Sequence, residues 1–423
     1  MVQIILYTAL KVIKTLKNLI FTPTGKDTLI VFAGTAVNVV TGGLFFVIVP
    51  RILGPSSYGL FSTVVATSIF VVSFANFGID TGILKFAKKG SPAFNKYLSL
   101  AFYSYILLGL LVSISGVFLS GPISIFLAHP ELTSLFRIAF SATILLLLTN
   151  FYSAGLQAQE KFTQASLVNI SSNVLRFVII SLALVFMKVD LTFVTSLFFF
   201  VTLISIVTGV LFLPIKLEKI AKVDLLKFHN YNFWIGASLI IASFPLDNYV
   251  LVKLAGAKEA GIYSAPFKIL TFVYQFAGNF SRVLAPRFSS FETNKKAKTF
   301  AIKSFSYVIL FSFFIFVLAL FATPLIRLLF GNNYSDAIPV FRILTIGFIF
   351  FFASAIPVSI ILYYLGSSRI SFILTVLNVV LFFLLLLIMV PAKGAQGASL
   401  AFSLTETLYF LACSSYVLIK LNK

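Results

Sequence analysis

Cysteines, histidines and carboxylates are scarce in this sequence of 423 residues, and each shortage argues against a class of protein. The chain has one cysteine, Cys413, and two histidines, His129 and His229, with no cluster of metal-binding residues around either histidine. A disulfide framework needs paired cysteines, and a zinc site needs clustered Cys, His or carboxylate ligands. We therefore expect neither, and we predict no metal or other cofactor.

Only 12 residues are Asp or Glu. A membrane glycosyltransferase or polymerase would need carboxylates at an active site that faces a loop. The expected outer loops contain only scattered acids, namely Glu131, Asp190, Glu259 and Asp336. The segment TGKDT at 24–28 resembles a phosphate-binding loop, but Ile20 stands where such a loop has its first glycine. The sequence therefore does not favour an enzyme.

Charged residues make up only 10% of the chain, whereas 60% of the residues are hydrophobic and the mean hydropathy is +1.06. A soluble domain does not have this balance. Crossing a bilayer takes about 20 consecutive apolar residues in a helix. Twelve segments of the chain meet this requirement: 28–50, 58–77, 97–119, 132–153, 167–187, 191–213, 232–254, 261–283, 302–323, 337–363, 370–391 and 396–418. The sequence therefore predicts an all-α polytopic membrane protein with twelve transmembrane helices.

Basic residues are distributed unevenly over the two faces that this topology defines. Of the 32 Lys and Arg residues, 22 fall on the face of the N-terminus, 8 fall on the opposite face, and Arg176 and Lys268 lie within spans. Cytoplasmic loops carry the excess of Lys and Arg in membrane proteins. We therefore expect both termini to be cytoplasmic in a multi-pass protein of the cell (inner) membrane. Although the net charge is +20, we expect no nucleic-acid partner, because no soluble binding platform accompanies the lysines.

Within the N-terminal segment 1–27, residues 1–20 are too short and too basic to be a span. At helical spacing, an apolar face (Val12, Ile13, Leu16, Leu19 and Ile20) lies opposite a polar one (Lys11, Lys14, Lys17 and Asn18). This pattern predicts an interfacial helix on the anionic cytoplasmic leaflet, and a frayed basic tail is the alternative. No small-residue cleavage site follows, so we do not expect a cleaved signal peptide.

Two halves of the chain share a motif. RILGPSSYGLFS at 51–62 aligns with KLAGAKEAGIYS at 253–264 with an offset of 202 residues. Pro122 matches Pro324 at the same offset, and Phe136-Arg137-Ile138 and Asn173 match Phe341-Arg342-Ile343 and Asn378 at an offset of 205. Six spans per half is an even number, so the repeats are expected to be parallel. We predict an N-lobe at 28–213 and a C-lobe at 214–423, with a cavity between them that opens alternately to each side.

Four charged residues fall within the predicted spans: Arg176, Asp247, Lys268 and Glu406. Charges at the centre of a span cost roughly 2.5–3.5 kcal/mol on insertion scales, so each needs a partner or a function. Asp247 and Lys268 stand at equal depth on consecutive helices, which predicts a buried ion pair. Pro245, two residues before Asp247, predicts a bend there, and an interrupted helix beside an ionisable residue is a sign of a transport site. A structural pair and a functional site are both compatible with this pattern.

Arg176 suits capture of a phosphate or pyrophosphate, because its guanidinium binds such groups through two hydrogen bonds. Glu406 and Asp247 are candidates for coupling transport to an ion. Several amides also fall within spans, and such residues either link helices or bind sugars. These amides are Asn38, Asn76, Asn169, Asn173 and Asn279.

Three stretches of the chain resemble the polysaccharide transporter family, the O-antigen-type flippases of the multidrug/oligosaccharidyl-lipid/polysaccharide superfamily. They are RILGPSSYGLFS, NFGIDTGILKFAKKG closing the second span, and DNYVLVKLAGAKEAGIYSAPFKIL across the seventh and eighth, and LLFGNNYSDAIPVFRIL at 328–344 fits the same family. The resemblance covers the chain from about residue 25 to its end.

This resemblance implies a V-shaped fold of twelve helices, with spans one, two, seven and eight lining a central cavity. It implies transfer of a polyprenyl-pyrophosphate-linked oligosaccharide from the cytoplasmic to the outer leaflet, for synthesis of lipopolysaccharide or another cell-surface polysaccharide. Asn38, Asp247, Lys268 and Asn279 would lie on or near the cavity, while the access of Arg176, in span five, is less direct. The expected partners are the lipid-linked substrate, membrane lipids, and a polysaccharide polymerase and glycosyltransferases, and the protein is expected to be a monomer.

Two other transporters remain as alternatives. A cation-coupled multidrug or lipid exporter of the same superfamily would have acidic residues deep in its N-terminal lobe, whereas Asp80 lies at a span end. A peptidoglycan-precursor flippase usually has two further spans and a more basic cavity.

Overall fold

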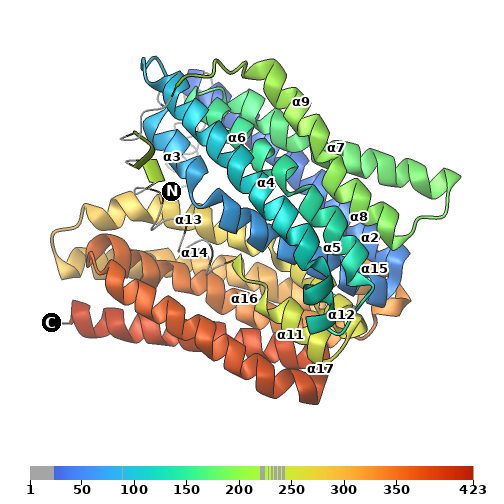
Figure 1. The fold of residues 1–423 in the computed structure, drawn as a ribbon. Coiled ribbons are helices and arrows are strands. Elements are labelled where there is room, and N and C mark those ends of the chain that lie inside the picture. The colour runs from blue at the N-terminus through green and yellow to red at the C-terminus, as the bar shows by residue number, and fades with distance from the viewer. Residues whose placement is uncertain are drawn as a thin grey trace, which may run out of the picture. The chain divides into compact units, whose positions relative to one another are not determined.

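The computed structural model describes residues 23–422, apart from residues 88, 220–223, 227, 230–231, 233–235, 237–239 and 241–242 (Figure 1). The side chains of residues 23–36, 39, 279 and 282 are not described either. The interfacial helix predicted within residues 1–20 therefore lies outside the described residues. Every regular element within the described ranges is a helix.

The helices of the first half of the chain are α2 (Pro23–Asn76), α3 (Ile79–Phe86), α4 (Phe94–Phe126), α5 (Leu132–Ser141), α6 (Thr143–Ala158), α7 (Phe162–Phe186), α8 (Leu191–Phe200) and α9 (Thr202–Phe212). Those of the second half are α11 (Leu246–Leu254), α12 (Ala257–Leu270), α13 (Phe272–Ser289), α14 (Asn294–Leu320), α15 (Ala322–Phe330), α16 (Ala337–Ser359) and α17 (Ser368–Leu421), with the short turns η1 (Asn332–Tyr334) and η2 (Ile360–Tyr364).

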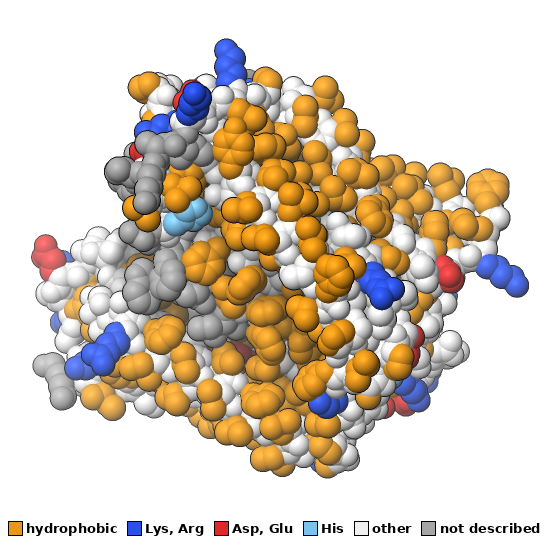
Figure 2. Space-filling view, in the orientation of Figure 1, with side chains coloured by type: hydrophobic (Ala, Val, Ile, Leu, Met, Phe, Trp, Pro, Cys, Tyr) orange, Lys and Arg blue, Asp and Glu red, His pale blue; other side chains and the backbone are white. Residues whose placement is uncertain are grey.

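Among the described residues, eight helical stretches are long and apolar enough to cross a membrane. They are Val40–Asn76, Phe94–Phe126, Leu132–Ala158, Phe162–Phe186, Leu191–Phe212, Asn294–Leu320, Ala337–Tyr364 and Ser368–Leu421. Hydrophobic side chains cover much of the face seen in Figure 2, as expected of a surface in contact with lipid. The chain is therefore a multi-pass, all-helical membrane protein.

Two of these helices, α2 and α17, contain 54 residues each, which would extend about 80 Å if they were straight, against a hydrocarbon core of about 30 Å. Each is interrupted at a glycine whose backbone is not helical, Gly54 (φ 69°, ψ 171°) and Gly394 (φ 51°, ψ −128°). Glycine adopts positive φ without steric cost. Each helix therefore divides at its glycine into two segments, which match the paired spans predicted at 28–50 and 58–77 and at 370–391 and 396–418.

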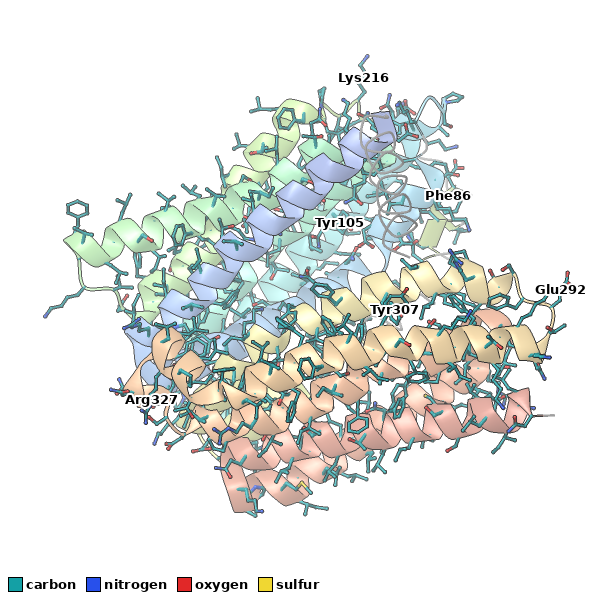
Figure 3. All side chains as sticks on the ribbon, turned by 180° about the vertical axis from the view of Figure 1, so that it is seen from behind. Phe86, Tyr105, Lys216, Glu292, Tyr307 and Arg327 are labelled. Atoms are coloured by element: carbon teal, nitrogen blue, oxygen red, sulfur yellow. The ribbon has the colours of Figure 1, made fainter. Side chains whose placement is uncertain are left out.

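The chain forms two compact units. Unit 1 comprises residues up to Phe45, Thr67–Gly121 and Thr133–Phe244, and unit 2 comprises Phe46–Ala66, Pro122–Leu132 and Pro245–Lys423. The division predicted at residues 213 and 214 stays a prediction. The core of unit 1 is aromatic: the ring of Phe151 lies 5.5 Å from that of Phe102 and 6.2 Å from that of Tyr105, which is labelled in Figure 3. Burial of these rings holds α4 against α6.

Unit 2 has its own aromatic core, in which α12, α16 and α17 meet. Phe267 lies 5.4 Å from Phe348 and 5.7 Å from Phe402, and the last two rings are 5.0 Å apart. Figure 1 shows α16 and α17 running side by side, and Gly347 lets them approach closely, because a Cβ at that position would come within 2.7 Å of the Phe402 ring. These contacts pack α12 against α16 and α17.

The two copies of the sequence motif both lie in unit 2 and adopt the same backbone conformation. Gly256, 202 residues after Gly54, has φ 92° and ψ 169°. Each motif therefore makes a turn at its first glycine and begins a helix directly after it, the second part of α2 in one case and α12 in the other.

The contacts between these two motifs are reciprocal. A Cβ on Gly59 would overlap the carbonyl oxygen of Ala257, and a Cβ on Gly261 would overlap the carbonyl oxygen of Pro55, which stands 202 residues before Ala257. Small residues at both positions let the two helix backbones touch.

A second pair of contacts also joins residues that are related by the offset of 202 residues. An Arg51 guanidinium nitrogen (Nη1) donates to the carbonyl oxygen of Leu328 at 3.4 Å, and the Lys253 ammonium lies 3.5 Å from the centre of the Phe126 ring. Lys253 follows Arg51, and Leu328 follows Phe126, by 202 residues in each case. Each motif thus contacts the hydrophobic residue that belongs to the other half of the chain.

Glu259, in the first turn of α12, links this helix to the second part of α17. Its Oε2 accepts a hydrogen bond from the Ala395 N–H at 2.7 Å, directly after the break at Gly394. We expect Glu259→Ala to lower the free energy of unfolding by about 1–2 kcal/mol, because the start of a helix segment loses a charged acceptor. Thermal unfolding of the purified protein in detergent measures this change.

The matched control is Glu292→Ala, which removes an exposed carboxylate in the loop between α13 and α14. Glu259→Gln keeps an acceptor oxygen and should lose less stability than Glu259→Ala. Equal apparent Tm values for Glu259→Ala and Glu292→Ala would show that the hydrogen bond contributes nothing.

Candidate functional site

The side chain of Arg176 on α7 is enclosed within unit 1 and is 8% exposed. Its Nε donates to the carbonyl oxygen of Phe198 on α8 at 2.9 Å, and its Nη1 donates to Oδ1 of Asn173 at 2.8 Å. The guanidinium also stacks over the Phe198 ring, 4.3 Å from its centre. Arg176 is therefore oriented by two neutral acceptors and an aromatic face.

Asn173 extends this network to α2. Its Nδ2 donates to Oδ1 of Asn38 at 2.7 Å and lies beside Gly42 on the same helix, where an added Cβ would make an ordinary contact with that nitrogen at 3.4 Å. The structure thus joins two of the predicted site residues, Asn38 and Arg176, through a third side chain. We call Asn38, Asn173 and Arg176 the arginine network.

The arginine network contains no acid. Within the described part of the chain, no carboxylate lies within ion-pair distance of Arg176. The ion pairs found there are Lys89–Glu160, Lys96–Asp224, His129–Glu131 and Lys258–Asp336. Burying a charge in a membrane span without a counter-ion is costly, and such residues commonly mark a substrate or ion pathway. The network can supply positive charge to an anion that approaches it.

The ion pair predicted between Asp247 and Lys268 is wrong. The Lys268 ammonium lies over the ring of Phe46, 4.2 Å from its centre, and no Asp247–Lys268 bridge is present within unit 2. Oδ1 of Asp247 instead accepts from the backbone N–H of Asn248 at 2.8 Å and from its Nδ2 at 3.3 Å.

The reason for this difference is the break before α11. Phe244 and Pro245 are not helical and α11 begins at Leu246, so the helix is interrupted at Pro245. Asp247 therefore stands in the first turn of a helix, where backbone N–H groups are free to bind a carboxylate. Equal depth alone does not pair two charges when a nearer partner satisfies one of them.

Asn248 connects the two motifs. Its Oδ1 accepts from Ser264 at 3.1 Å and from Ser62 at 3.5 Å, and these serines are the last residues of the two motifs. Asp247, Asn248, Ser62 and Ser264 thus form one polar cluster in unit 2, which we call the serine cluster. Lys268 lies on the same helix as Ser264, one turn further along.

Glu406 on α17 has a single described hydrogen bond, 3.5 Å from Nδ2 of Asn378 to its Oε1. Asn378 is the residue that matches Asn173 in the other half of the chain. One of the two matched asparagines therefore contacts a cation in unit 1, and the other contacts a carboxylate in unit 2. The side chain of Asn279, also predicted for the site, lies outside the described residues.

The family model for polysaccharide biosynthesis proteins matches residues 24–292, which is more than half of the chain. The chain belongs to this family. A protein of Shigella flexneri described as "Putative O-antigen transporter" is 25% identical over 306 residues, which cover 68% of this chain and 72% of that protein. The resemblance stated from the sequence motifs is therefore confirmed.

Solved structures show that this family member has the fold of transporters of the multidrug/oligosaccharidyl-lipid/polysaccharide superfamily. The lipid II flippase MurJ in an inward closed conformation has a TM-score of 0.69 at 17% identity, with 93% of this chain and 91% of that chain covered. An outward-facing multidrug resistance transporter of the MATE family has a TM-score of 0.61 at 14% identity, covering 96% and 97%. At these identities the likeness concerns the fold alone.

Two other amides of this polysaccharide biosynthesis protein link helices, which is one of the two roles predicted for amides within spans. The Tyr105 hydroxyl donates to Oδ1 of Asn76 at 2.6 Å, and Nδ2 of Asn169 donates to Ser153 at 2.9 Å.

Sequence reasoning missed the partners of the charged residues: Phe198 beside Arg176, Phe46 beside Lys268, and Asn248 beside Asp247. Asn248 could have been noted because it follows Asp247 directly, but nothing in the sequence marks the two phenylalanines among 51.

Proposed function

We propose that this protein is a flippase that moves a polyprenyl-pyrophosphate-linked oligosaccharide from the cytoplasmic to the outer leaflet. The observation that carries the proposal is the arginine network: a buried cation in a membrane span, held by neutral groups and without a carboxylate partner in the described chain. The pyrophosphate of the substrate is the anion that such a group suits. Family membership and the O-antigen transporter relative support the same substrate class.

Moving a lipid-linked oligosaccharide between leaflets requires no catalytic residues. Carrying a pyrophosphate and several sugars through hydrocarbon is prohibitively costly without a hydrated path, whereas the lipid tail can stay in the bilayer. A flippase therefore needs polar and cationic side chains and two access states. Asn38 and Arg176 in unit 1, and Asp247, Lys268 and Asn279 in unit 2, are the residues we assign to the substrate path. Asp247 and Glu406 are the candidates for ion coupling.

The proposed arrangement has twelve spans, formed by two parallel repeats of six helices that rock to give alternating access. The reciprocal contacts of the two motifs support the repeat, since each half contacts the other through equivalent residues. The broken helices α2 and α17 support the count, because each half of such a helix is long enough for one span. The 22-to-8 distribution of basic residues supports cytoplasmic termini in the inner membrane.

The protein would work as a monomer beside the glycosyltransferases and the polymerase that make and use its substrate. Reconstitution in vesicles tests the proposal with a fluorescent lipid-linked oligosaccharide and a membrane-impermeant quencher. Vesicles that contain the protein should expose the label at the opposite leaflet faster than protein-free vesicles.

A cation-coupled multidrug or lipid exporter is the second candidate, and the fold shared with the MATE transporter favours it. The same vesicles, loaded with a cationic dye and energised with a proton or sodium gradient, distinguish the two. Gradient-driven dye movement without oligosaccharide transfer would overturn the flippase proposal in favour of the exporter.

A further inference from the structure

A cluster of basic side chains surrounds a cavity where α13 ends and α14 begins. The cavity has a volume of about 400 Å³ and is lined by Arg287, Phe291, Lys295, Lys296, Thr299, Phe300 and Lys303. All four of its cations are exposed. We call this the basic cavity, and it lies wholly within unit 2.

The charge of the basic cavity is not balanced by the described protein. None of its four cations lies within ion-pair distance of a described carboxylate. Glu292 is exposed in the adjoining loop, and Figure 3 shows it at the end of the helix pair. Lys298 belongs to another face of α14, since its ammonium donates to Asn422 at 3.1 Å. Four cations around one cavity at the end of a span attract an anionic group.

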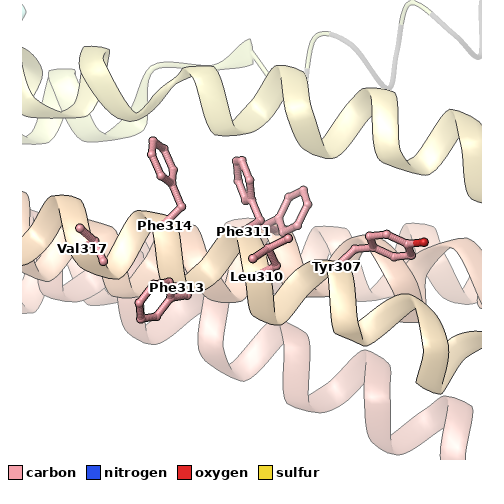
Figure 4. A pocket seen from close by; sticks show the side chains of 7 residues that line it. Tyr307, Leu310, Phe311, Phe313, Phe314 and Val317 are labelled. Atoms are coloured by element: carbon pink, nitrogen blue, oxygen red, sulfur yellow. The ribbon is translucent and has the colours of Figure 1, made fainter. Parts of the chain in front are cut away.

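An apolar cavity of about 590 Å³ lies further along the same helix. It is lined by Tyr307, Leu310, Phe311, Phe313, Phe314, Val317 and Phe352, and Figure 4 shows the α14 members. Leu310 is 68% exposed and Phe314 is 52% exposed, so the cavity is open to the surroundings of the helix. Because α14 is a membrane span, those surroundings are hydrocarbon. We call this the aromatic groove.

The basic cavity and the aromatic groove share one face of α14. The lining residues Lys296, Thr299, Lys303, Tyr307, Leu310, Phe314 and Val317 follow one another at intervals of three or four residues. Residues at this spacing form a single stripe on a helix. The stripe carries cations at its start and only apolar or aromatic side chains from Leu310 onward.

We propose that this stripe is the binding site of an anionic diacyl phospholipid from the leaflet at the basic end. Its phosphate would lie among Arg287, Lys295, Lys296 and Lys303, and one acyl chain would lie in the aromatic groove. From Lys303 to Val317 the stripe spans 14 residues, about 21 Å. The part of the stripe that forms the aromatic groove, from Tyr307 to Val317, spans 10 residues or about 15 Å, which equals the half-thickness of the hydrocarbon core. That depth fits an acyl chain of one leaflet, whereas a long polyprenyl chain would extend beyond the groove.

The proposal is independent of the transported substrate, because it uses none of the residues assigned to the substrate path. The test compares Lys296→Gln/Lys303→Gln with the control Lys298→Gln/Lys420→Gln. The control removes the same charge from exposed lysines of unit 2, one on another face of α14 and one near the end of α17. Native mass spectrometry of each protein from nanodiscs that contain equal phosphatidylglycerol and phosphatidylcholine counts the lipids retained.

We expect the unmodified protein and the control to retain phosphatidylglycerol in preference to phosphatidylcholine. The Lys296→Gln/Lys303→Gln variant should bind phosphatidylglycerol about tenfold or more weakly, since each cation near an anionic headgroup contributes to binding. Leu310→Trp, which fills the groove and keeps every charge, should also reduce retention. Circular dichroism and a monodisperse elution profile establish that each variant is folded.

Equal retention of the two lipids by the unmodified protein would overturn the proposal and indicate ordinary contact with surrounding lipid. Full displacement of phosphatidylglycerol by millimolar inorganic phosphate would also overturn it, because the groove would then contribute nothing. Displacement by an equimolar amount of a polyprenyl phosphate would overturn the choice of a diacyl lipid and assign the stripe to an isoprenoid carrier.

Discussion

A Gly59→Ala substitution should destabilise the protein by about 3 kcal/mol and lower its apparent Tm by about 5 °C or more, although it adds one methyl group. The added Cβ would overlap the Ala257 carbonyl oxygen and lie 2.8 Å from the backbone nitrogen of Gly261. Because the obstacle is backbone, no side-chain rotation can relieve it. Thermal unfolding in detergent, followed by circular dichroism, measures the loss.

Gly43→Ala is the matched control, since Gly43 lies on the same helix α2 and has no atom within 4 Å of an added Cβ. That change should leave stability unchanged or raise it slightly, as alanine is the better helix former. Gly261→Ala should behave like Gly59→Ala, because its Cβ would overlap the Pro55 carbonyl oxygen. Equal Tm values for Gly59→Ala and Gly43→Ala would show that the helices do not touch at this point.

Arg176→Gln should reduce oligosaccharide transfer by roughly 30-fold or more while the protein stays folded. A buried charge that binds an opposite charge contributes about 2 kcal/mol or more when its partner is present, which corresponds to this factor. Within the described protein Arg176 binds only the Phe198 carbonyl oxygen, the Asn173 amide oxygen and an aromatic ring, so its loss leaves no carboxylate unpaired. Initial rates in the vesicle assay measure the effect.

Arg137→Gln is the control for Arg176→Gln, since Arg137 is exposed on α5 and its loss also removes one positive charge. Arg176→Lys should restore little of the rate, because a lysine cannot bind both acceptors and present a planar guanidinium. Wild-type transfer rates in Arg176→Gln and in an Arg176→Ala/Lys268→Ala variant would remove both residues from the substrate path and leave the fold unaffected.

Helix positions in this chain followed from composition, because a bilayer demands long apolar segments with internally satisfied backbones. The segment predicted at 97–119 falls within α4, and most of each segment predicted at 167–187, 302–323 and 337–363 falls on α7, α14 and α16. The segments at 232–254 and 261–283 were harder to predict. The part of this region that is described is divided among the short helices α11, α12 and α13. The break at Pro245 was predicted, and the break at Gly256 lies in the gap predicted between these two segments. The boundary at Thr271, between α12 and α13, was not predicted.

The sequence named the charged residues of the candidate site, whereas it did not reveal their partners. Arg176 and Lys268 stood out because charges are rare in spans, and the structure encloses Arg176 in unit 1. The predicted Asp247–Lys268 pair failed because the turn after Pro245 offers Asp247 the N–H of its own neighbour. Which phenylalanine stacks on a cation depends on helix rotation, and a sequence with 51 phenylalanines does not reveal rotation.

The sequence alone determined three properties: the protein is a membrane protein, its charges are concentrated in particular parts of the chain, and one motif occurs twice. Those properties depend on the local sum of transfer free energies and on residue identity, both of which are readable along a chain. Tertiary structure decided that the two motifs meet at Gly59 and Gly261, that Arg176 is held without an acid in the described chain, and that cations and aromatic rings share one stripe of α14. Each of these depends on which helix faces are turned toward each other, and packing sets that only when the whole chain has folded.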